Sequence, residues 1–142
     1  FKGMLECIGL ELNFNTNRLL KLGELGREFG FAFQLNDDLA DFQEERITGK
    51  ESFKDLSEGK YTYPIISSIK NMPELEQKNL IYAIDSKNYD FVYKKLAEFE
   101  GFKSTRQARD SSVQKCIKYS KDLIGLDDSE FVTEYLTTLL KA

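Results

Sequence analysis

Apolar residues recur along most of this chain at the three- and four-residue spacing of a helix face. This periodicity predicts one helix that has Pro64 in its first turn, where the missing N–H is harmless, and that ends before Met72. It predicts further helices over residues 1–12, 16–45, 73–84, 89–100, 104–124 and 129–141. Gly101 and Gly125 fit helix C-terminal stops. No stretch has the alternation of a strand, so the prediction is an all-α protein whose residues 1–142 form a single segment.

The longest predicted helix, residues 16–45, has two contrasting sides, and either Asn15 or Thr16 can cap its start. One side gathers apolar residues: Leu22, Leu25, Phe29, Ala32, Phe33 and Leu39. The opposite side gathers small, polar and acidic residues: Gly23, Gly26, Arg27, Gly30, Gln34, Asp37, Asp38 and Asp41. Glycines inside a helix cost about 1 kcal/mol each relative to Ala, so something must approach this side closely. A neighbouring helix would explain them, and so would a ligand chain; we favour a cavity wall that ends in a metal site.

The acidic end of that side concentrates three carboxylates at spacings of one, three and four. On a helix Asp37 and Asp41 point the same way, with Asp38 beside them and Gln34 one turn earlier. Three anions among apolar neighbours repel one another and lose water unless a cation is present or the face stays wet. Oxygen ligands suit hard divalent cations, and Mg²⁺ keeps one or two carboxylates together with phosphate oxygens. The pattern favours a Mg²⁺–phosphate site, and a solvated acidic face is the alternative.

The polar segment 44–59 is predicted to be a loop, or a loop with one short turn. Lys50 lies within it after a glycine, and Lys60 follows it after a second glycine. A lysine on a flexible segment beside an acidic cluster can reach a phosphate as a compact point charge. A solvated surface lysine is the alternative for each.

The composition of the chain excludes several classes of protein and site. The formal net charge of −4 argues against a nucleic-acid surface, and no apolar run approaches the roughly 20 residues that span a bilayer. The chain has no His, which excludes His-based nucleophilic pairs and zinc sites from it. We interpret Cys7 and Cys116 as buried free thiols in a reducing, cytoplasmic compartment. No signal peptide opens the chain; it begins at Phe1 in a helical pattern, so we expect part of a longer protein.

Three motifs taken together resemble the second half of a trans-isoprenyl diphosphate synthase, a family that makes geranyl, farnesyl, geranylgeranyl and longer diphosphates. The motifs are FQLNDDLAD, TGK and DLSEGKYTYP. In this resemblance the carboxylates match the family's second aspartate-rich motif, the two glycine–lysine pairs match those downstream of it, and Pro64 matches the proline that opens the next helix. Lys2 looks like the lysine of the family's Lys-Thr pair, although Gly3 stands where Thr is commonest.

The resemblance implies roles for these residues. Asp37 and Asp41 would hold Mg²⁺ on the diphosphate of an allylic substrate, with Asp38 in or next to the metal's ligand shell. Contacts to the diphosphate would come from Lys2, Lys50 and Lys60, and Phe33 and Gln34 would border isopentenyl diphosphate and the reacting carbons. The implied reaction is ionisation of the allylic diphosphate followed by head-to-tail attack of isopentenyl diphosphate. The implied assembly is a homodimer.

One departure from the family matters. Its first aspartate-rich motif and its usual isopentenyl diphosphate-binding basic residues belong to a first helical half that this chain does not match. We therefore expect half of an active site here, completed by the same or a separate chain. The alternatives are a non-catalytic subunit of a heteromeric synthase, a terpene cyclase with the same fold, and a helical interaction module.

Overall fold

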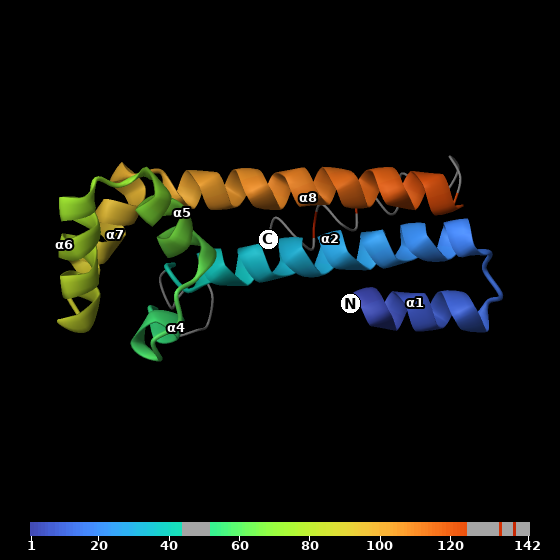
Figure 1. Ribbon diagram of the computed structural model, residues 1–142, viewed down its shortest axis with the longest axis horizontal. Coiled ribbons are helices and arrows are strands. Elements are labelled where there is room, and N and C mark those ends of the chain that lie inside the picture. The colour runs from blue at the N-terminus through green and yellow to red at the C-terminus, as the bar shows by residue number, and fades with distance from the viewer. Residues whose placement is uncertain (44–51, 125–133, 135–137, 139–142) are drawn as a thin grey trace. The chain divides into compact units, whose positions relative to one another are not determined.

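The computed structural model describes residues 1–43 and 52–124 together with residues 134 and 138. These residues contain helices and no strand, which confirms the all-α prediction for this part of the chain (Figure 1). The helices are α1 Lys2–Glu11, α2 Thr16–Ala40, α4 Lys54–Ser57, α5 Tyr63–Asn71, α6 Glu74–Asp85, α7 Tyr89–Glu98 and α8 Gly101–Ile124. The predictions that concern Lys50, Gly125 and, apart from residues 134 and 138, a helix over 129–141 fall outside the described ranges.

The chain divides into two compact units. The first unit comprises residues 1–36 and 108–142, and the second comprises residues 37–107. The boundary falls within α2 and again within α8, so each of these helices contributes to both units. Each unit has its own buried cluster, and each is described by itself below.

In the first unit α2 and α8 run antiparallel, as successive contacts between them show. Arg109 Nη1 donates to Asn36 Oδ1 at 3.0 Å, Ser112 Oγ donates to Glu28 Oε2 at 2.8 Å, and Lys21 Nζ donates to Asp122 Oδ2 at 3.1 Å. The residue number falls along one helix as it rises along the other. The buried cluster between them comprises Ala32, Val113, Cys116 and Ile117, with Leu25 and Phe29 packed against it. Asn15 caps α2, since its Oδ1 accepts from the Arg18 N–H at 3.0 Å.

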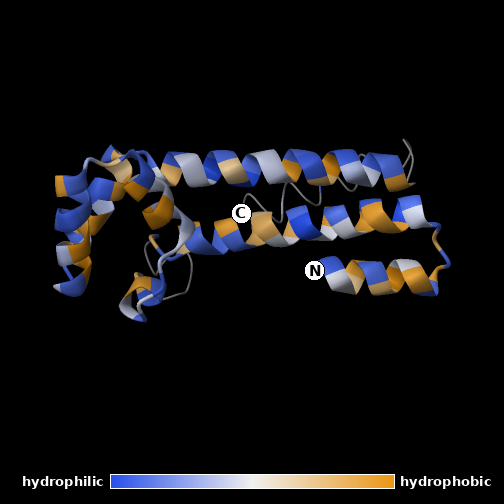
Figure 2. Cartoon of the chain, in the orientation of Figure 1, coloured by the Kyte–Doolittle hydropathy of each residue, from blue (hydrophilic) through white to orange (hydrophobic). Residues whose placement is uncertain are grey.

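The glycine side of α2 is covered by α1 rather than by a cavity, so the prediction of a cavity wall is wrong for these glycines. A Cβ added at Gly26 would lie 2.9 Å from the Phe1 carbonyl oxygen, and one added at Gly30 would lie 3.0 Å from the Phe1 ring. A Cβ at Gly23 would meet the Glu6 carboxylate. The missing side chains let α1 approach the α2 backbone, which is the first of the two interpretations given above. Figure 2 shows hydrophobic and hydrophilic residues interspersed along both helices.

Two further expectations are corrected. Cys116 is buried as predicted, but Cys7 on α1 is exposed. Gly101 does not stop a helix; it opens α8, and the residue before it, Glu100, takes the left-handed conformation with φ 59°. A Cβ at Gly101 would lie 2.5 Å from the Pro64 carbonyl oxygen, so this glycine allows α8 and α5 to approach closely.

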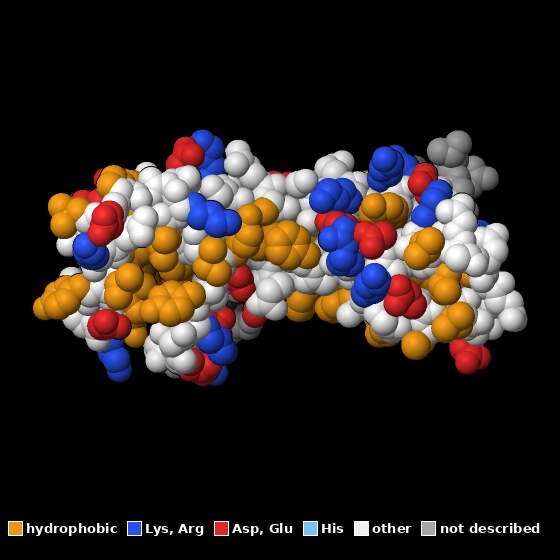
Figure 3. Space-filling model, viewed as in Figure 1, with side chains coloured by type: hydrophobic (Ala, Val, Ile, Leu, Met, Phe, Trp, Pro, Cys, Tyr) orange, Lys and Arg blue, Asp and Glu red, His pale blue; other side chains and the backbone are white. Residues whose placement is uncertain are grey.

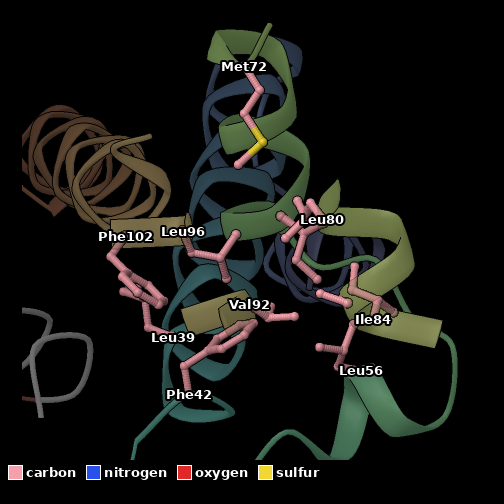
Figure 4. Packing of buried hydrophobic residues seen from close by; sticks show 11 residues of the cluster. Leu39, Phe42, Leu56, Met72, Leu80, Ile84, Val92, Leu96 and Phe102 are labelled. Carbon is pink, nitrogen blue, oxygen red and sulfur yellow. The ribbon is translucent and has the colours of Figure 1, made fainter. Parts of the chain in front are cut away.

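In the second unit α5, α6 and α7 enclose an apolar core with the last turn of α2 (Figure 4). The fully buried members include Ile65, Leu80, Val92 and Leu96, and Leu39, Phe42, Leu56, Met72, Ala83, Ile84 and Phe102 complete the cluster. Ile65 is fully buried, whereas its neighbour Ile66 is 44% exposed, because adjacent residues of a helix point in different directions. This core fixes Phe42, directly after Asp41, and so anchors the acidic end of α2.

Candidate metal and diphosphate site

The predicted acidic cluster lies in the last turn of α2 and just after it, in the second unit. Asp38 and Asp41 are each only 6% exposed, whereas Asp37 is half-buried. The side chains of Leu39 and Phe42 belong to the apolar core. Asp38 and Asp41 alternate with them in the sequence and are therefore largely buried with them. The cluster is therefore not a solvated acidic face.

Two of the carboxylates accept backbone N–H groups of the chain that returns after residue 52. Asp38 Oδ2 accepts from the Tyr63 N–H at 2.9 Å, at the first residue of α5. Asp41 Oδ1 accepts from the Asp55 N–H at 3.0 Å, in the first turn of α4. The Asp41 carbonyl oxygen also accepts from the Phe53 N–H at 2.7 Å. The two acids thus tie the end of α2 to the starts of α4 and α5.

The second carboxylate oxygen of Asp41, Oδ2, is buried and has no hydrogen-bond partner among the described residues. Burial raises the pKa of Asp41; the Asp55 N–H opposes this effect and the Asp55 charge adds to it. A buried carboxylate oxygen without a partner is costly unless a proton or a cation satisfies it. The donor set therefore fits a hard divalent cation, although no group of three or more acidic, His or Cys ligands is already assembled among the described residues.

Lys60 lies in the same unit and is held by acids of its own segment. Its Nζ lies 2.8 Å from Asp55 Oδ1 and 2.8 Å from Glu58 Oε2, and its side chain is 58% exposed. These hydrogen bonds and the two negative charges raise the pKa of Lys60, so it is a permanent cation at neutral pH. The Lys60 N–H also donates to the Asp55 carbonyl oxygen at 2.9 Å. Asp55 thus joins Asp41 to Lys60.

The remaining predicted residues belong to the first unit. Lys2 Nζ lies 3.9 Å from Glu6 Oε1, one helical turn along α1. Phe33 is 47% exposed, and its ring centroid lies 5.9 Å from that of Phe1 and 6.5 Å from that of Phe29. Gln34 is exposed. Phe33 and Gln34 thus lie at the surface of the first unit.

Sequence reasoning missed the part that Asp55 and Tyr63 play in this region. Both residues lie in the DLSEGKYTYP motif, but the sequence assigned no role to either. Their contacts with the acidic cluster use backbone N–H groups, which every residue except proline carries. The sequence offered one signal: an acidic side chain such as Asp38 can accept the N–H groups at the N-terminus of a later helix.

Fold and site together define an all-helical protein with an aspartate cluster at the end of a long helix and a lysine nearby in the chain. Comparison with known proteins gives the family, since the polyprenyl synthetase profile matches residues 1–98. The chain belongs to the polyprenyl synthetase family. The resemblance described from the sequence is thereby confirmed.

Individual relatives agree with this assignment. The chain is 27% identical over 117 residues to a short chain isoprenyl diphosphate synthase from Methanothermobacter thermautotrophicus, covering 82% of this chain and 36% of that protein. It is 33% identical over 85 residues to solanesyl diphosphate synthase 3 from Arabidopsis thaliana, covering 59% of this chain and 20% of that protein. The solved polyprenyl synthase from Roseobacter denitrificans has the same fold, with a TM-score of 0.84 at 20% identity.

The chain spans only part of these relatives. The match to the Roseobacter structure covers 99% of this chain but 48% of that one. A second solved structure, of a geranylgeranyl pyrophosphate synthase, matches with a TM-score of 0.73 at 25% identity, and the match covers 94% of this chain and 44% of that one. In the described ranges, none of the helices combines the length and the apolar character needed to cross a membrane.

Proposed function

We propose that this chain supplies the C-terminal half of the active site of a trans-prenyltransferase. The reaction is the Mg²⁺-dependent, head-to-tail condensation of isopentenyl diphosphate with an allylic prenyl diphosphate to a longer polyprenyl diphosphate. The observation that carries the proposal is the buried, unpartnered Oδ2 of Asp41 within the aspartate-rich motif. Membership of the family and the match to isoprenyl diphosphate synthases support it.

Asp37 and Asp41 are the residues that would hold magnesium, and Asp38 lies beside them. Bound there, Mg²⁺ would neutralise the charge that develops on a departing diphosphate. Asp41 has one oxygen engaged by the Asp55 N–H and the other unpaired, so it can accept a cation without losing its hydrogen bond. The burial that raises its pKa is then offset by the cation's positive charge.

The lysines of this chain would bind the diphosphate itself. Lys60 can exchange its contacts with Asp55 and Glu58 for phosphate oxygens at small cost, because ion pairs of an exposed lysine are weak. We assign the same task to Lys2 and Lys50 on the strength of the family motif. Phe33 would border the reacting carbons with Gln34, since an apolar wall keeps water from an allylic cation.

The other half of the site would come from a segment equivalent to the part of the relatives that this chain does not cover. We call this chain together with such a segment the complete assembly, and we propose that it forms a homodimer. Large apolar side chains lie at the surface of the first unit, as expected of a fold that continues beyond this chain. They include Met4, Ile8, Leu20 and Phe31, each between 44% and 63% exposed, and Figure 3 shows hydrophobic patches on the face it draws.

The test is product formation by the complete assembly with isopentenyl diphosphate, an allylic starter and Mg²⁺. Asp37→Ala is expected to lower kcat by about 10²–10³, the loss typical of removing one group that stabilises developing charge. Glu74→Ala, a change in an exposed acid on α6 that pairs with Lys78, is the matched control and should leave the rate unchanged. An unchanged rate in Asp37→Ala would instead indicate the non-catalytic subunit.

A companion measurement concerns this chain alone. The 142 residues by themselves are expected to give no prenyl product, because the first aspartate-rich motif is not among them. Product from the isolated chain with Mg²⁺ and both substrates would contradict the assignment of half a site. A cyclic hydrocarbon in place of a longer diphosphate would identify a terpene cyclase.

A further inference from the structure

The start of α5 is capped by a residue of a different helix. Thr62 occupies the N-cap position, but its side chain makes no capping hydrogen bond, and its Oγ1 is buried without a partner in the described part of the chain. The first N–H of the helix, that of Tyr63, donates instead to Asp38 Oδ2 at 2.9 Å. Asp38 therefore does for α5 what a capping serine or aspartate does within its own helix.

The segment that leads to α5 is held at its other end as well. The Asp55 N–H donates to Asp41 Oδ1 at 3.0 Å, and the Asp55 carbonyl oxygen accepts from the Lys60 N–H at 2.9 Å. Lys60 lies between these two attachment points, three residues before Tyr63. Removing either attachment would free one end of the segment that carries the lysine.

We propose that Asp38 is a positioning residue: by capping α5 through the Tyr63 N–H, it fixes the segment that presents Lys60 to the diphosphate. This rests on the proposed function, and it separates Asp38 from Asp37 and Asp41, which it leaves as the metal ligands. Asp38 is 6% exposed, and one of its oxygens is engaged at a helix N-terminus, where the helix dipole favours an anion. The consecutive aspartates of the motif thus have different tasks.

The distinguishing feature of this role is that an amide can perform it. Asparagine offers Tyr63 the same acceptor oxygen as aspartate, whereas alanine offers none. A magnesium ligand behaves differently, because loss of the carboxylate charge weakens metal binding in either variant. The experiment compares Asp38→Asn and Asp38→Ala with Asp37→Asn as the metal-ligand reference, all in the complete assembly.

Steady-state kinetics with titrated Mg²⁺ give the main readout. Asp38→Ala is expected to raise KM for the allylic diphosphate about tenfold, the effect of losing one hydrogen bond to a charged group, whereas Asp38→Asn stays within about twofold of the wild type. Neither changes the Mg²⁺ concentration that gives half the maximal rate, and Asp37→Asn raises that concentration about tenfold or more. Amide hydrogen exchange at Tyr63 should accelerate in Asp38→Ala and remain slow in Asp38→Asn.

A double-mutant cycle with Lys60→Met asks whether Asp38 acts through the lysine. If it does, Asp38→Ala adds little to the KM of Lys60→Met. Equal defects in Asp38→Asn and Asp38→Ala with a raised Mg²⁺ requirement, or fully additive effects with Lys60→Met, would overturn the positioning role alone. A wild-type assembly that forms no product would overturn the proposed function and with it this role.

Discussion

Asp41 carries a charge that the second unit buries with one oxygen unpaired, and neutralising it should stabilise the metal-free protein. The side chain is 6% exposed, its Oδ2 has no partner among the residues that the structure describes, and burial raises its pKa. Asp41→Asn removes the charge but keeps an Oδ1 acceptor for the Asp55 N–H. An unsatisfied buried polar group costs about 1–3 kcal/mol. The Asn variant still buries unpaired amide hydrogens, which offset part of the gain. We therefore expect the free energy of unfolding at pH 7 to rise by about 1 kcal/mol.

The gain should depend on pH in a direction fixed by the raised pKa. A carboxyl group whose pKa is higher in the folded state binds its proton more tightly there than in the unfolded chain. Its stabilising contribution is present below the ordinary carboxyl pKa of about 4 and is lost as the pH rises through the folded value. The difference between Asp41→Asn and the wild type should therefore be close to zero near pH 3.5 by this mechanism and should open as the pH rises to 7.

Urea unfolding followed by circular dichroism measures both effects, with and without Mg²⁺. Magnesium at about ten times its dissociation constant should add about 1.4 kcal/mol to the wild type and little to Asp41→Asn, which reverses their order. The slope of the free energy against urea should stay the same in both proteins. A variant less stable than the wild type at pH 7 without metal, or equal stabilisation of both proteins by Mg²⁺, would refute the reasoning.

Three further outcomes test the packing. Iodoacetamide at pH 8 should add one group to the native chain, at exposed Cys7, and two groups after denaturation. Cys116 is protected in the native chain because burial raises its pKa to about 12. Mass spectrometry counts the adducts, and modification of native Cys116 would contradict its burial. Gly26→Ala should cost about 1–3 kcal/mol in thermal unfolding, since its Cβ meets the α1 backbone, whereas Gly3→Ala, with open space around it, should not destabilise; equal effects would argue against the α1–α2 contact. Leu96→Ala should cost about 2–5 kcal/mol by urea unfolding, because the side chain is fully buried, and a cost below 1 kcal/mol would show that the core is not packed as described.

The helices could be predicted from the sequence because their apolar spacing depends only on local order in the chain. The start of α2 at Thr16 follows from its Asn15 cap, and Pro64 lies in the first turn of α5 as predicted. The predictions were wrong where a contact between distant parts of the chain determined the local structure. Gly101 has the composition of a helix stop, but Glu100 makes the left-handed turn, and the glycine is needed for the approach to Pro64.

The same limit applies to the candidate site. The spacing predicts Asp37, Asp38 and Asp41 near the end of one helix, because residues three and four apart share a helix face. The described residues do not show the three acids assembled as one metal-ligand group. Their partners come from the backbone of a later segment, which no residue type identifies, so the contacts of Asp38 with Tyr63 and of Asp41 with Asp55 required the structure. The glycines of α2 were compatible with a helix or a ligand from sequence alone, and the position of α1 decides between them.

Glu28 is a buried carboxylate in the middle of the long helical pair, and it has a consequence for how α2 and α8 find their alignment. It is 3% exposed; Arg27 accompanies it on its own helix, while Ser112 and Lys115 reach it from α8 at 2.8 and 3.4 Å. Sliding one helix past the other by a turn would carry the hydroxyl about 5.4 Å away while leaving apolar contacts of similar kind. The misaligned pair would lose about 1–3 kcal/mol at this one carboxylate, so a buried polar group in an otherwise apolar interface selects a single alignment for the two helices.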